Sequence, residues 1–356
     1  MNFRNYKSLS VNFDNRINII LGNNAQGKSN LLESIYLLSM GKSFRTIKDT
    51  EMIRFNEDFL RVKGVFIKKE EELSLEIIFK NKEKRFKING LESVKNADLL
   101  ENAYIVVFSP EDIQIIKEEP ERRRKYLDRE LFLIRPLYFR DMSRYKKSLL
   151  QRNSILKEEF PDASMLDVWD DNLIYYGLKI IRERKRFIEK LKIESREIYY
   201  NICGRKETFE LRYEPNIEIS DEINKQESSY KRILSESRGY DLSRKTTTRG
   251  PHKDDFSMFI NGIDVRRFGS QGQQRTAALA LKLAELMIIK EETGEEAIVI
   301  LDDVLSELDK ERQHFLIDSL FKSQIFISAA EINNDIRDAF AEGKFFYINK
   351  GEVSYK

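Results

Sequence analysis

The sequence predicts an α/β protein whose core is split in two by a long helical insertion. The apolar run Ile17–Leu21 has the character of a buried strand, and it leads through a glycine-bearing loop into a helical pattern. Between Phe59 and Ile88 apolar and polar residues alternate, as in an antiparallel sheet with one buried face. The pattern is helical from 112 to 207, and strand patterns return after it. We therefore predict a mixed sheet, a flanking antiparallel sheet and an inserted α-helical domain.

The loop after the first strand reads G-x-x-x-x-G-K-S, and the strand before it and the helix after it are those of a phosphate-binding loop. The glycines allow successive N–H groups and a helix N-terminus to face a polyphosphate. Lys28 adds a point charge for the β- and γ-phosphates, and the Ser29 hydroxyl can ligate Mg²⁺. The nucleotide-binding residues predicted here are Gly22, Asn23, Asn24, Ala25, Gln26, Gly27, Lys28, Ser29 and Asn30.

Composition limits the class of protein. With 356 residues, of which 41% are hydrophobic and 34% charged, the chain has room for two domains or for one core with a large insertion. No signal-peptide pattern opens the chain, and no apolar run approaches the length of a membrane span. The single Cys203 excludes an intramolecular disulfide, which favours a reducing cytosol, and two histidines cannot complete a Cys/His zinc cluster. A net charge of +2 neither demands nor excludes nucleic acid.

The N-terminal part carries the patterns of several strands and one helix. The expected elements are strands at Val11–Phe13, Ile17–Leu21 and Tyr104–Phe108, and a helix at Leu31–Leu38. The polar loop Gly41–Thr46 is placed to fold back towards a nucleotide. The alternating region ends at Asn89-Gly90, which is a hairpin turn pair.

The middle of the chain predicts a helical arm. Amphipathic patterns cover Leu137–Phe160 and Ser164–Tyr200, and Pro161-Asp162 separates them. Two long helices joined by a short break suggest an antiparallel pair. A short strand at Phe209–Tyr213 and a helix at Glu222–Arg238 follow.

The C-terminal part returns to strand and turn chemistry. The expected elements are a turn-rich stretch at Thr246–Asp255, a hairpin of Phe256–Ile260 and Ile263–Phe268 around Asn261-Gly262, a helix at Thr276–Lys290 and a buried strand at Ala297–Leu301. We therefore divide the chain into a first core half (1–111), a helical arm (112–245) and a second core half (246–356).

Two acids follow the last of these strands. Asp302 and Asp303 stand at its carboxyl end, which is where ligand crevices lie in open α/β sheets. Asp302 is placed to hold Mg²⁺ through water, and Asp303 to orient and polarise the water that attacks the γ-phosphate. The alternative is that both acids merely cap the next helix. Lys28 and Asp303 are thus the predicted catalytic residues, and Ser29 and Asp302 the predicted metal ligands.

A second helix N-terminus suits an anion. Ser270–Arg275 opens the helix at Thr276–Lys290, with Ser270 as a natural N-cap and Gly272 allowing close approach of a phosphate. One triphosphate already fills the phosphate-binding loop, so this second site has no obvious partner within the same chain. A two-fold dimer would bring it against the nucleotide of the other subunit. An ordinary capped helix is the alternative.

The order of these motifs resembles that of the ABC ATPases of the SMC kind. Their residues resemble still more closely those of the RecF family of bacterial recombination mediators. The matching segments are Asn2–Tyr6, Gly22–Asn30, Ser43–Thr46, Phe108–Asp112, Gly250–Asp255, Ser270–Thr276 and Leu301–Asp309. They occur in the order of that family and span nearly the whole chain.

The resemblance implies an ATP-binding head of the ABC type, a helical arm in place of long coiled coils, and ATP-driven homodimerisation that clamps DNA. It implies a weak, DNA-stimulated ATPase that acts with RecR and RecO near single-strand/double-strand junctions and helps RecA at gaps, in the cytoplasm and on the nucleoid. By the same resemblance, Ser270, Gly272 and Gln273 touch the nucleotide of the partner subunit, and Ser306–Asp309 forms a loop across the dimer seam.

Three departures from the family pattern stand out. Several residues usually precede Asn2–Tyr6 as an edge strand, whereas here Met1 stands almost on top of it, so either the start is mis-assigned or that strand is curtailed. The strand Ile325–Ile327 ends in Ser328-Ala329-Ala330, where RecF tends to have threonines and transporter ATPases a histidine, so no γ-phosphate sensor is assigned. Asp303 is normal for RecF where most ABC ATPases have glutamate, and its shorter reach predicts slow hydrolysis.

Two basic runs are candidates for contacts to DNA phosphates. Arg122–Lys125 and Arg182–Arg186 would bind without sequence specificity and in a salt-sensitive way. The alternative for each is a solvated helix face paired with neighbouring Glu, and Arg122–Lys125 also matches an arginine-rich segment of the family that fits domain packing. No base-reading module is visible.

Three rival functions stay open on the sequence alone. An ATP-gated DNA-binding scaffold would hydrolyse ATP only incidentally. A transporter-type ABC subunit is disfavoured by the missing histidine after the strand Ile325–Ile327 and by the helical insertion. A P-loop kinase would not need Ser270–Arg275.

Overall fold

The computed structural model describes residues 1–46, 48–68, 70–93, 99, 102–218, 220, 222–320, 322–332 and 334–355. Two compact units divide the chain: the first is Met1–Asp112 together with Glu285–Lys356, and the second is Ile113–Ala284. The assignment of 246–356 to one half of an ATPase head stays a prediction. In the described part of the chain, no helix has an apolar stretch long enough to cross a membrane.

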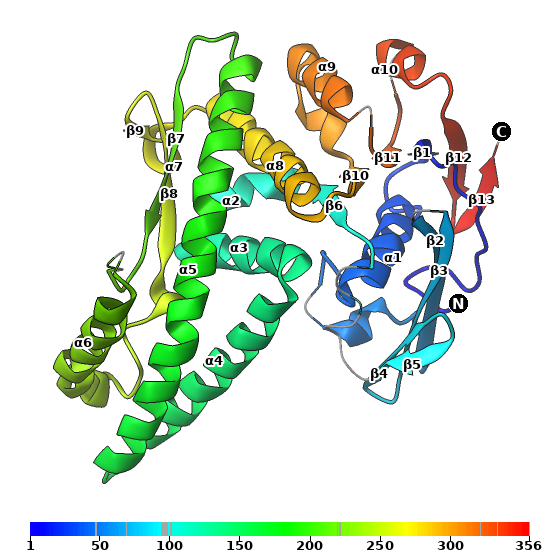
Figure 1. The fold of residues 1–356 in the computed structure, drawn as a ribbon. Helices are drawn as coiled ribbons and strands as arrows, with labels where there is room; N and C mark the ends of the chain where they lie inside the picture. Colours follow the sequence, from blue (N-terminus) through cyan, green and yellow to red (C-terminus); the bar gives the residue numbers. More distant parts are fainter. Residues whose placement is uncertain are drawn as a thin grey trace. The chain divides into compact units, whose positions relative to one another are not determined.

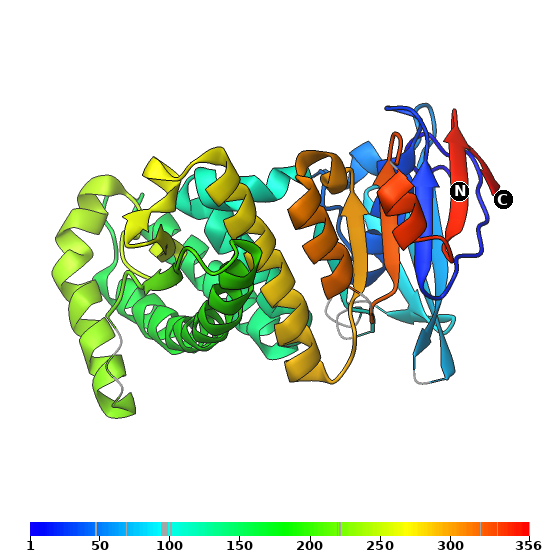
Figure 2. The same cartoon turned by 90° about the horizontal axis from the view of Figure 1, so that it is seen from above.

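A mixed six-stranded sheet forms the centre of the first unit (Figures 1 and 2). Its strands, in spatial order, are β13 (Glu352–Tyr355), β12 (Lys344–Asn349), β1 (Ile17–Leu21), β11 (Ile325–Ala329), β10 (Ile298–Asp302) and β6 (Ile105–Phe108). All neighbours are parallel except β12 and β13. Because both edges of β1 are paired and every strand next to it is parallel, the carboxyl ends of β1, β10 and β11 meet at one edge of the sheet.

Helix α1 (Lys28–Met40) packs between this sheet and a second, antiparallel one. The second sheet has the order β2 (Phe59–Lys68), β3 (Glu71–Lys80), β4 (Glu83–Ile88) and β5 (Leu91–Ser93), which confirms the predicted flanking sheet. Its buried face shares a core with Leu37 and Leu38 of α1. Asn89 and Gly90 both have positive φ, as a tight hairpin turn requires. The unit also contains helices α9 (Lys310–Ser319) and α10 (Asn334–Ala339), and 3₁₀ turns at Asp49–Met52, Pro110–Ile113 and Val304–Glu307.

The predicted strand at Val11–Phe13 is wrong. These residues form no strand, and the Phe13 ring instead packs edge-on against Phe326 and Phe346, with ring centroids 4.9 and 5.4 Å apart. The neighbouring strand β1 already pairs with β11 on one side and β12 on the other. A segment just before it therefore finds no open edge there and covers the sheet with its aromatic side chain.

The second unit is mainly helical. Its helices are α2 (Gln114–Lys117), α3 (Pro120–Ile134), α4 (Pro136–Ile155), α5 (Ala163–Ile202), α6 (Ile223–Arg244) and α7 (Val265–Phe268), and α8 (Gln271–Thr293) begins here. A small sheet of β7 (Phe209–Glu214), β8 (Asp255–Ile260) and β9 (Ile263–Asp264) completes it, with a 3₁₀ turn at Pro251–Lys253. The predicted pair of long helices is confirmed as α4 and α5, which pack against each other.

Two predicted elements run too far. Helix α4 ends at Ile155 rather than at Phe160, because Asp162 caps α5 by accepting from the N–H groups of Ser164 and Met165, and the chain needs the intervening residues to reverse. The strand predicted at Ile263–Phe268 ends at Asp264. The Asp264 carboxylate accepts from Arg266 N and Arg267 N and so starts α7.

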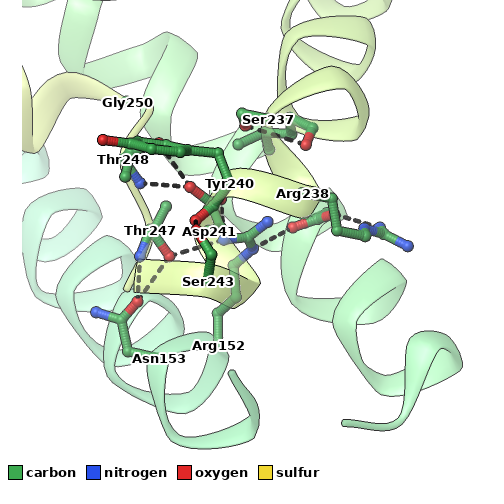
Figure 3. A network of polar contacts seen from close by, with 12 residues as sticks. Arg152, Asn153, Ser237, Arg238, Tyr240, Asp241, Ser243, Thr247, Thr248 and Gly250 are labelled. Atoms are coloured by element: carbon green, nitrogen blue, oxygen red, sulfur yellow. Dashed lines mark hydrogen bonds and ion pairs between the residues drawn. The ribbon is translucent and has the colours of Figure 1, made fainter. Parts of the chain in front are cut away.

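The segment 246–255 is tied to the helices by buried arginines. Arg152 on α4 is fully buried and donates to Asp241 Oδ2 at 2.7 Å and to Thr247 Oγ1 at 2.9 Å (Figure 3). It also donates to Asp170 Oδ1 at 2.5 Å. Thr247 N in turn donates to Asn153 Oδ1 at 2.7 Å. Thr247 is therefore buried within the helical unit, whereas Arg249 and Lys253 of the same segment are exposed.

A second buried guanidinium, that of Arg184 on α5, holds the far end of the same segment. It donates to Asp128 Oδ1 at 2.8 Å and to Asp254 Oδ2 at 3.2 Å, and it also reaches the carbonyl of Pro251 at 2.6 Å. Burial raises the pKa of Asp254, while Arg184 and the Tyr213 hydroxyl oppose that rise. Arg184 is thus the shared ion-pair partner of Asp128 and Asp254.

Candidate nucleotide-binding site

The phosphate-binding loop requires glycine at two positions. Gly22 has φ +155° and Gly27 has φ +117°. A Cβ on Gly22 would lie 2.4 Å from the carbonyl oxygen of Ile348, and one on Gly27 would lie 2.6 Å from Asn5 Nδ2. Neither neighbour has room to move far, since the first is backbone and the second is hydrogen-bonded. The loop is therefore a close-fitting cradle made of backbone.

The segment Asn5-Tyr6 supports the loop from outside. Asn5 Nδ2 donates to the carbonyl of Gln26 at 2.9 Å, and the Tyr6 hydroxyl donates to the carbonyl of Gly27 at 3.0 Å. Both hydrogen bonds are accepted by carbonyl oxygens of the loop, so these oxygens point outward. This arrangement favours N–H groups on the inner side, where an anion would lie.

Helix α1 begins at Lys28 without a capping side chain, because its N-cap is Gly27. The first N–H groups of a helix have no partner within it, so this end suits an anion. The Lys28 ammonium is buried; it lies 3.4 Å from the carbonyl oxygen of Asn23 and 4.0 Å from Asp303 Oδ1. A helix N-terminus, a glycine cradle and a buried cation together fit a polyphosphate.

The carboxyl ends of β10 and β11 bring an acid against the end of the loop. Ser29 Oγ donates to Asp302 Oδ1 at 2.8 Å, so the two predicted metal ligands are in contact although they lie far apart in sequence. Burial raises the pKa of the Asp302 carboxyl above its usual value, and hydrogen bonds from Ser328 and Ser29 oppose the rise. One hydroxyl and one carboxylate fit Mg²⁺, which in nucleotide sites typically takes its other oxygens from phosphates and water.

Ser328 links the two acids. Its hydroxyl donates to Asp302 Oδ1 at 2.7 Å and accepts from the Asp303 N–H at 3.0 Å. The register of the sheet places Ser328 directly opposite Asp302, and its side chain is fully buried. The sequence pointed to this position without assigning it a role. The structure shows it bonded to the acid pair.

Asp303 has a left-handed backbone, with φ 52°, and precedes the 3₁₀ turn at Val304–Glu307. Its side chain makes no capping hydrogen bond to that turn and is 39% exposed. Asp303 thus stands at the N-cap position of that turn, but its carboxylate does not cap it. Lys28, Ser29, Asp302 and Asp303 are brought together as predicted from their order in the sequence.

One turn after Ser29 lies a buried carboxylate that was not among the predicted site residues. Glu33 has a fully buried side chain and forms a bidentate pair with Arg4, at 2.8 and 2.5 Å. Ser43 also donates to Glu33, and Arg45 reaches Asn30 Oδ1 at 2.6 Å. The polar loop Gly41–Thr46 is thereby held against the first turn of α1. A lone acid within the apolar run of that helix was the available signal.

Ser270, Gly272 and Gln273 lie in the second unit, at the start of α8. Ser270 Oγ accepts from Gln273 N at 3.2 Å, and Gln273 Oε1 accepts from Ser270 N at 2.9 Å, which is a reciprocal capping box. The Gln273 amide also donates to Glu207 Oε1 at 2.7 Å. The predicted N-cap is confirmed, while contact of these residues with a nucleotide stays a prediction.

Several arginines of the two basic runs make contacts within the second unit. Arg123 forms a bidentate pair with Asp255, at 2.7 and 2.8 Å, and Arg124 donates to the carbonyl of Asp254 at 2.8 Å. In the other run Arg184 is buried, and Arg182 binds Gln226 Oε1 at 2.7 Å. The contacts of Arg123 and Arg124 fit the packing role left open above for Arg122–Lys125. A solvated helix face, the alternative for Arg182–Arg186, does not describe the buried Arg184. Contact of either run with DNA stays a prediction.

Comparison with known proteins settles the family. The family model for the RecF/RecN/SMC N-terminal domain matches residues 1–338. The chain belongs to this family. A protein named DNA replication and repair protein RecF from Clostridioides difficile is 43% identical over 357 residues, covering 99% of this chain and 96% of the relative. A protein of the same name from Alkaliphilus oremlandii is 41% identical, covering 99% and 98%.

Solved structures agree with the family. The structure of the recombination mediator protein RecF with ATP, described as part of the RecFOR pathway, has a TM-score of 0.93 and 41% identity, covering 100% of this chain and 95% of that one. An Smc head domain from Pyrococcus furiosus shares the fold at 15% identity, with a TM-score of 0.55 and coverage of 100% and 94%. The predicted fold class, an ABC-type P-loop ATPase head with an inserted helical domain, is confirmed. Membership of the RecF/RecN/SMC family disfavours the transporter and kinase alternatives.

Proposed function

We propose that this protein binds Mg-ATP, dimerises on it, and holds DNA without sequence specificity until slow hydrolysis reopens the dimer. The observation that carries the proposal is the convergence of Lys28, Ser29, Asp302 and Asp303 at one edge of the sheet, beside a glycine cradle. The relative with a TM-score of 0.93 is a RecF with ATP, which supports ATP as the nucleotide. The names of the relatives support a role in DNA replication and repair.

Each residue of the site has a distinct role in this proposal. Lys28 neutralises charge on the β- and γ-phosphates, and Ser29 and Asp302 hold Mg²⁺. When bound, the metal neutralises charge on the phosphates. Asp303 orients the attacking water, and as an aspartate with a half-exposed side chain it supports slow turnover. Such an enzyme would act as an ATP-gated switch, with weak hydrolysis that DNA stimulates.

The dimer is the part of the proposal that rests on the second helix N-terminus. Ser270, Gly272 and Gln273 would bind the γ-phosphate held by the partner subunit, and Ser306–Asp309 would line the seam. RecO, RecR and RecA are the proposed pathway partners, and gapped DNA with single-strand/double-strand junctions is the proposed substrate, on the nucleoid. Binding to gapped, single-stranded and duplex DNA with ATP, at two salt concentrations, tests this directly. Binding that ignores ATP would contradict the proposal.

Lys28→Arg is expected to weaken ATP binding roughly 10- to 100-fold, because a planar guanidinium cannot replace a buried, compact ammonium beside the phosphates. Equilibrium binding of a fluorescent ATP analogue measures the effect. Lys63→Arg, on the exposed side of β2, is the matched control and should leave affinity unchanged. Equal affinities in the wild type and both variants would contradict the role given to Lys28.

Ser328→Ala is expected to lower ATP turnover about tenfold while changing ATP affinity much less. The Asp302 carboxylate loses one of its two hydroxyl donors, and the Asp303 N–H loses its hydroxyl acceptor. Steady-state kinetics separate the two effects, and Ser328→Thr, which keeps the hydroxyl, should restore most of the turnover. A threonine variant as slow as the alanine variant would argue that packing, rather than the hydrogen bonds, governs the site.

A further inference from the structure

One face of helix α4 is unusually poor in acids. The chain has 60 acidic residues in 356, yet none lies between Met142 and Lys157. The outward side of the helix carries Arg140, Arg144 and Lys147 at the spacing i, i+4, i+7, and all are exposed. Gln151 and Ser154 continue the same line at i+11 and i+14, also exposed. We call these residues, Arg140, Arg144, Lys147, Gln151 and Ser154, the α4 stripe.

The cations of the α4 stripe have no acidic partner among the described residues. In the part of the chain that it describes, the structure gives no ion pair or hydrogen bond to the side chains of Arg140, Arg144 and Lys147, nor to that of Lys146 beside them. Some other exposed cations of this unit are paired, such as Arg212 with Glu210 and Lys225 with Glu222. Others, such as Arg205 and Lys245, have no partner among the described residues either. What distinguishes the α4 stripe is that its unpaired cations stand in one row along a single helix face.

The acids around the stripe do not neutralise it. Asp141, the acid on α4 itself, lies on the flank of the helix and pairs with Lys179 of α5 at 3.6 Å. Glu158 and Glu159 follow the end of the helix, beyond Ile155. The facing acid of α3, Asp128, is engaged by Arg184 and Tyr138. The stripe is left as a line of donors and cations facing solvent.

We infer that the α4 stripe contacts the phosphate backbone of double-stranded DNA. This rests on the proposed function, in which the protein holds DNA, and it names the surface that does so. From Arg140 to Lys147 the helix rises about 10 Å, and duplex DNA presents a negative charge about every 1.7 Å along its axis, so several phosphates lie within reach. The long side chains contact phosphates without reading bases.

The composition of the face favours duplex DNA over a single strand. Single-stranded sites commonly present aromatic side chains on which bases stack. Of the three aromatic residues of α4, Tyr138 and Tyr145 are buried, and Phe139 is half-buried and packs edge-on against Phe132. The exposed apolar residues of the helix, Leu137 and Leu150, are aliphatic. A row of cations and amide or hydroxyl donors suits a regular line of phosphates better than splayed bases.

The triple variant Arg140→Gln/Arg144→Gln/Lys147→Gln tests the inference, because glutamine keeps helix propensity while removing three charges. Binding of the full-length protein to a short random-sequence duplex with ATP is followed by anisotropy over a range of salt. The slope of log K against log salt should fall by roughly 2 to 3, and the affinity roughly 10²-fold at about 0.1 M salt. Arg212→Gln/Lys225→Gln/Lys231→Gln removes the same charge elsewhere in the unit and should leave the slope nearly unchanged.

The outcomes separate this inference from the proposed function. ATP turnover without DNA should be equal in all three proteins, which shows that the variants fold. If the wild type binds DNA with ATP but the two triple variants have the same slope, the stripe belongs to solvent or to an acidic protein partner and the inference falls alone. If the wild type shows no ATP-dependent DNA binding, the proposed function falls as well.

Discussion

Asp303→Asn is expected to bind ATP nearly as well as the wild type and to lose turnover by roughly 10²- to 10⁴-fold, the range typical of removing a positioned acid or base. The carboxylate stands 4.0 Å from the Lys28 ammonium, at the end of the loop that would hold the γ-phosphate. An amide of the same size keeps the shape of the site but cannot polarise a water molecule. Single-turnover hydrolysis measures the loss directly.

The same variant should accumulate an ATP-bound dimer, because hydrolysis is the step that reopens it. Size-exclusion chromatography with light scattering, run with Mg-ATP, distinguishes monomer from dimer. Asp318→Asn on the exposed side of α9 is the matched control and should behave as the wild type. A monomer in ATP, or turnover at the wild-type rate, would remove Asp303 from the role proposed here. Release of DNA at the normal rate would instead favour the scaffold, in which hydrolysis is incidental.

Arg184→Met is expected to destabilise the helical unit by about 3–5 kcal/mol, since removing one partner of a buried ion pair leaves charge uncompensated. Arg184 is the shared partner of Asp128 and Asp254, and its side chain is buried. For a unit of this size the loss corresponds to a fall of roughly 6–20 °C in the midpoint of its thermal transition. Calorimetry of the full chain should show this shift.

A double variant separates lost charge balance from lost packing. Asp254→Asn added to Arg184→Met removes one of the two acids and should recover part of the stability. Arg212→Met, at an exposed pair with Glu210, is the control and should change stability by no more than about 1 kcal/mol. If the double variant is less stable than Arg184→Met, the arginine matters for its packing and its hydrogen bonds rather than for its charge.

Much of the site could be predicted because its signals are local. A glycine loop between a strand and a helix, and an acid pair after an apolar strand, are patterns of contiguous residues with direct physical meanings. The contact of Ser328 with Asp302 joins positions 26 apart and depends on the register between β10 and β11, which no local pattern encodes.

The arginine runs show the converse limit. Arg123 and Arg184 lie in sequences crowded with charge, and a local reading places such runs on a solvated face. Their partners, Asp255 and Asp254, stand 132 and 70 positions away and become visible only when the chain is folded. The α4 stripe escaped notice for the opposite reason, because its cations are spread along a helix rather than clustered in sequence.

The anchored segment 246–255 has a mechanical consequence. Its backbone N–H groups at Thr247, Thr248 and Gly250 donate to side chains of α4, α6 and Asn216 rather than to one another. The chain then passes through β8 and β9 to Ser270. The position of the N-terminus of α8 is therefore set by the helices to which this segment is bonded. A displacement of these helices would therefore move the turn at Ser270–Gly272 together with them.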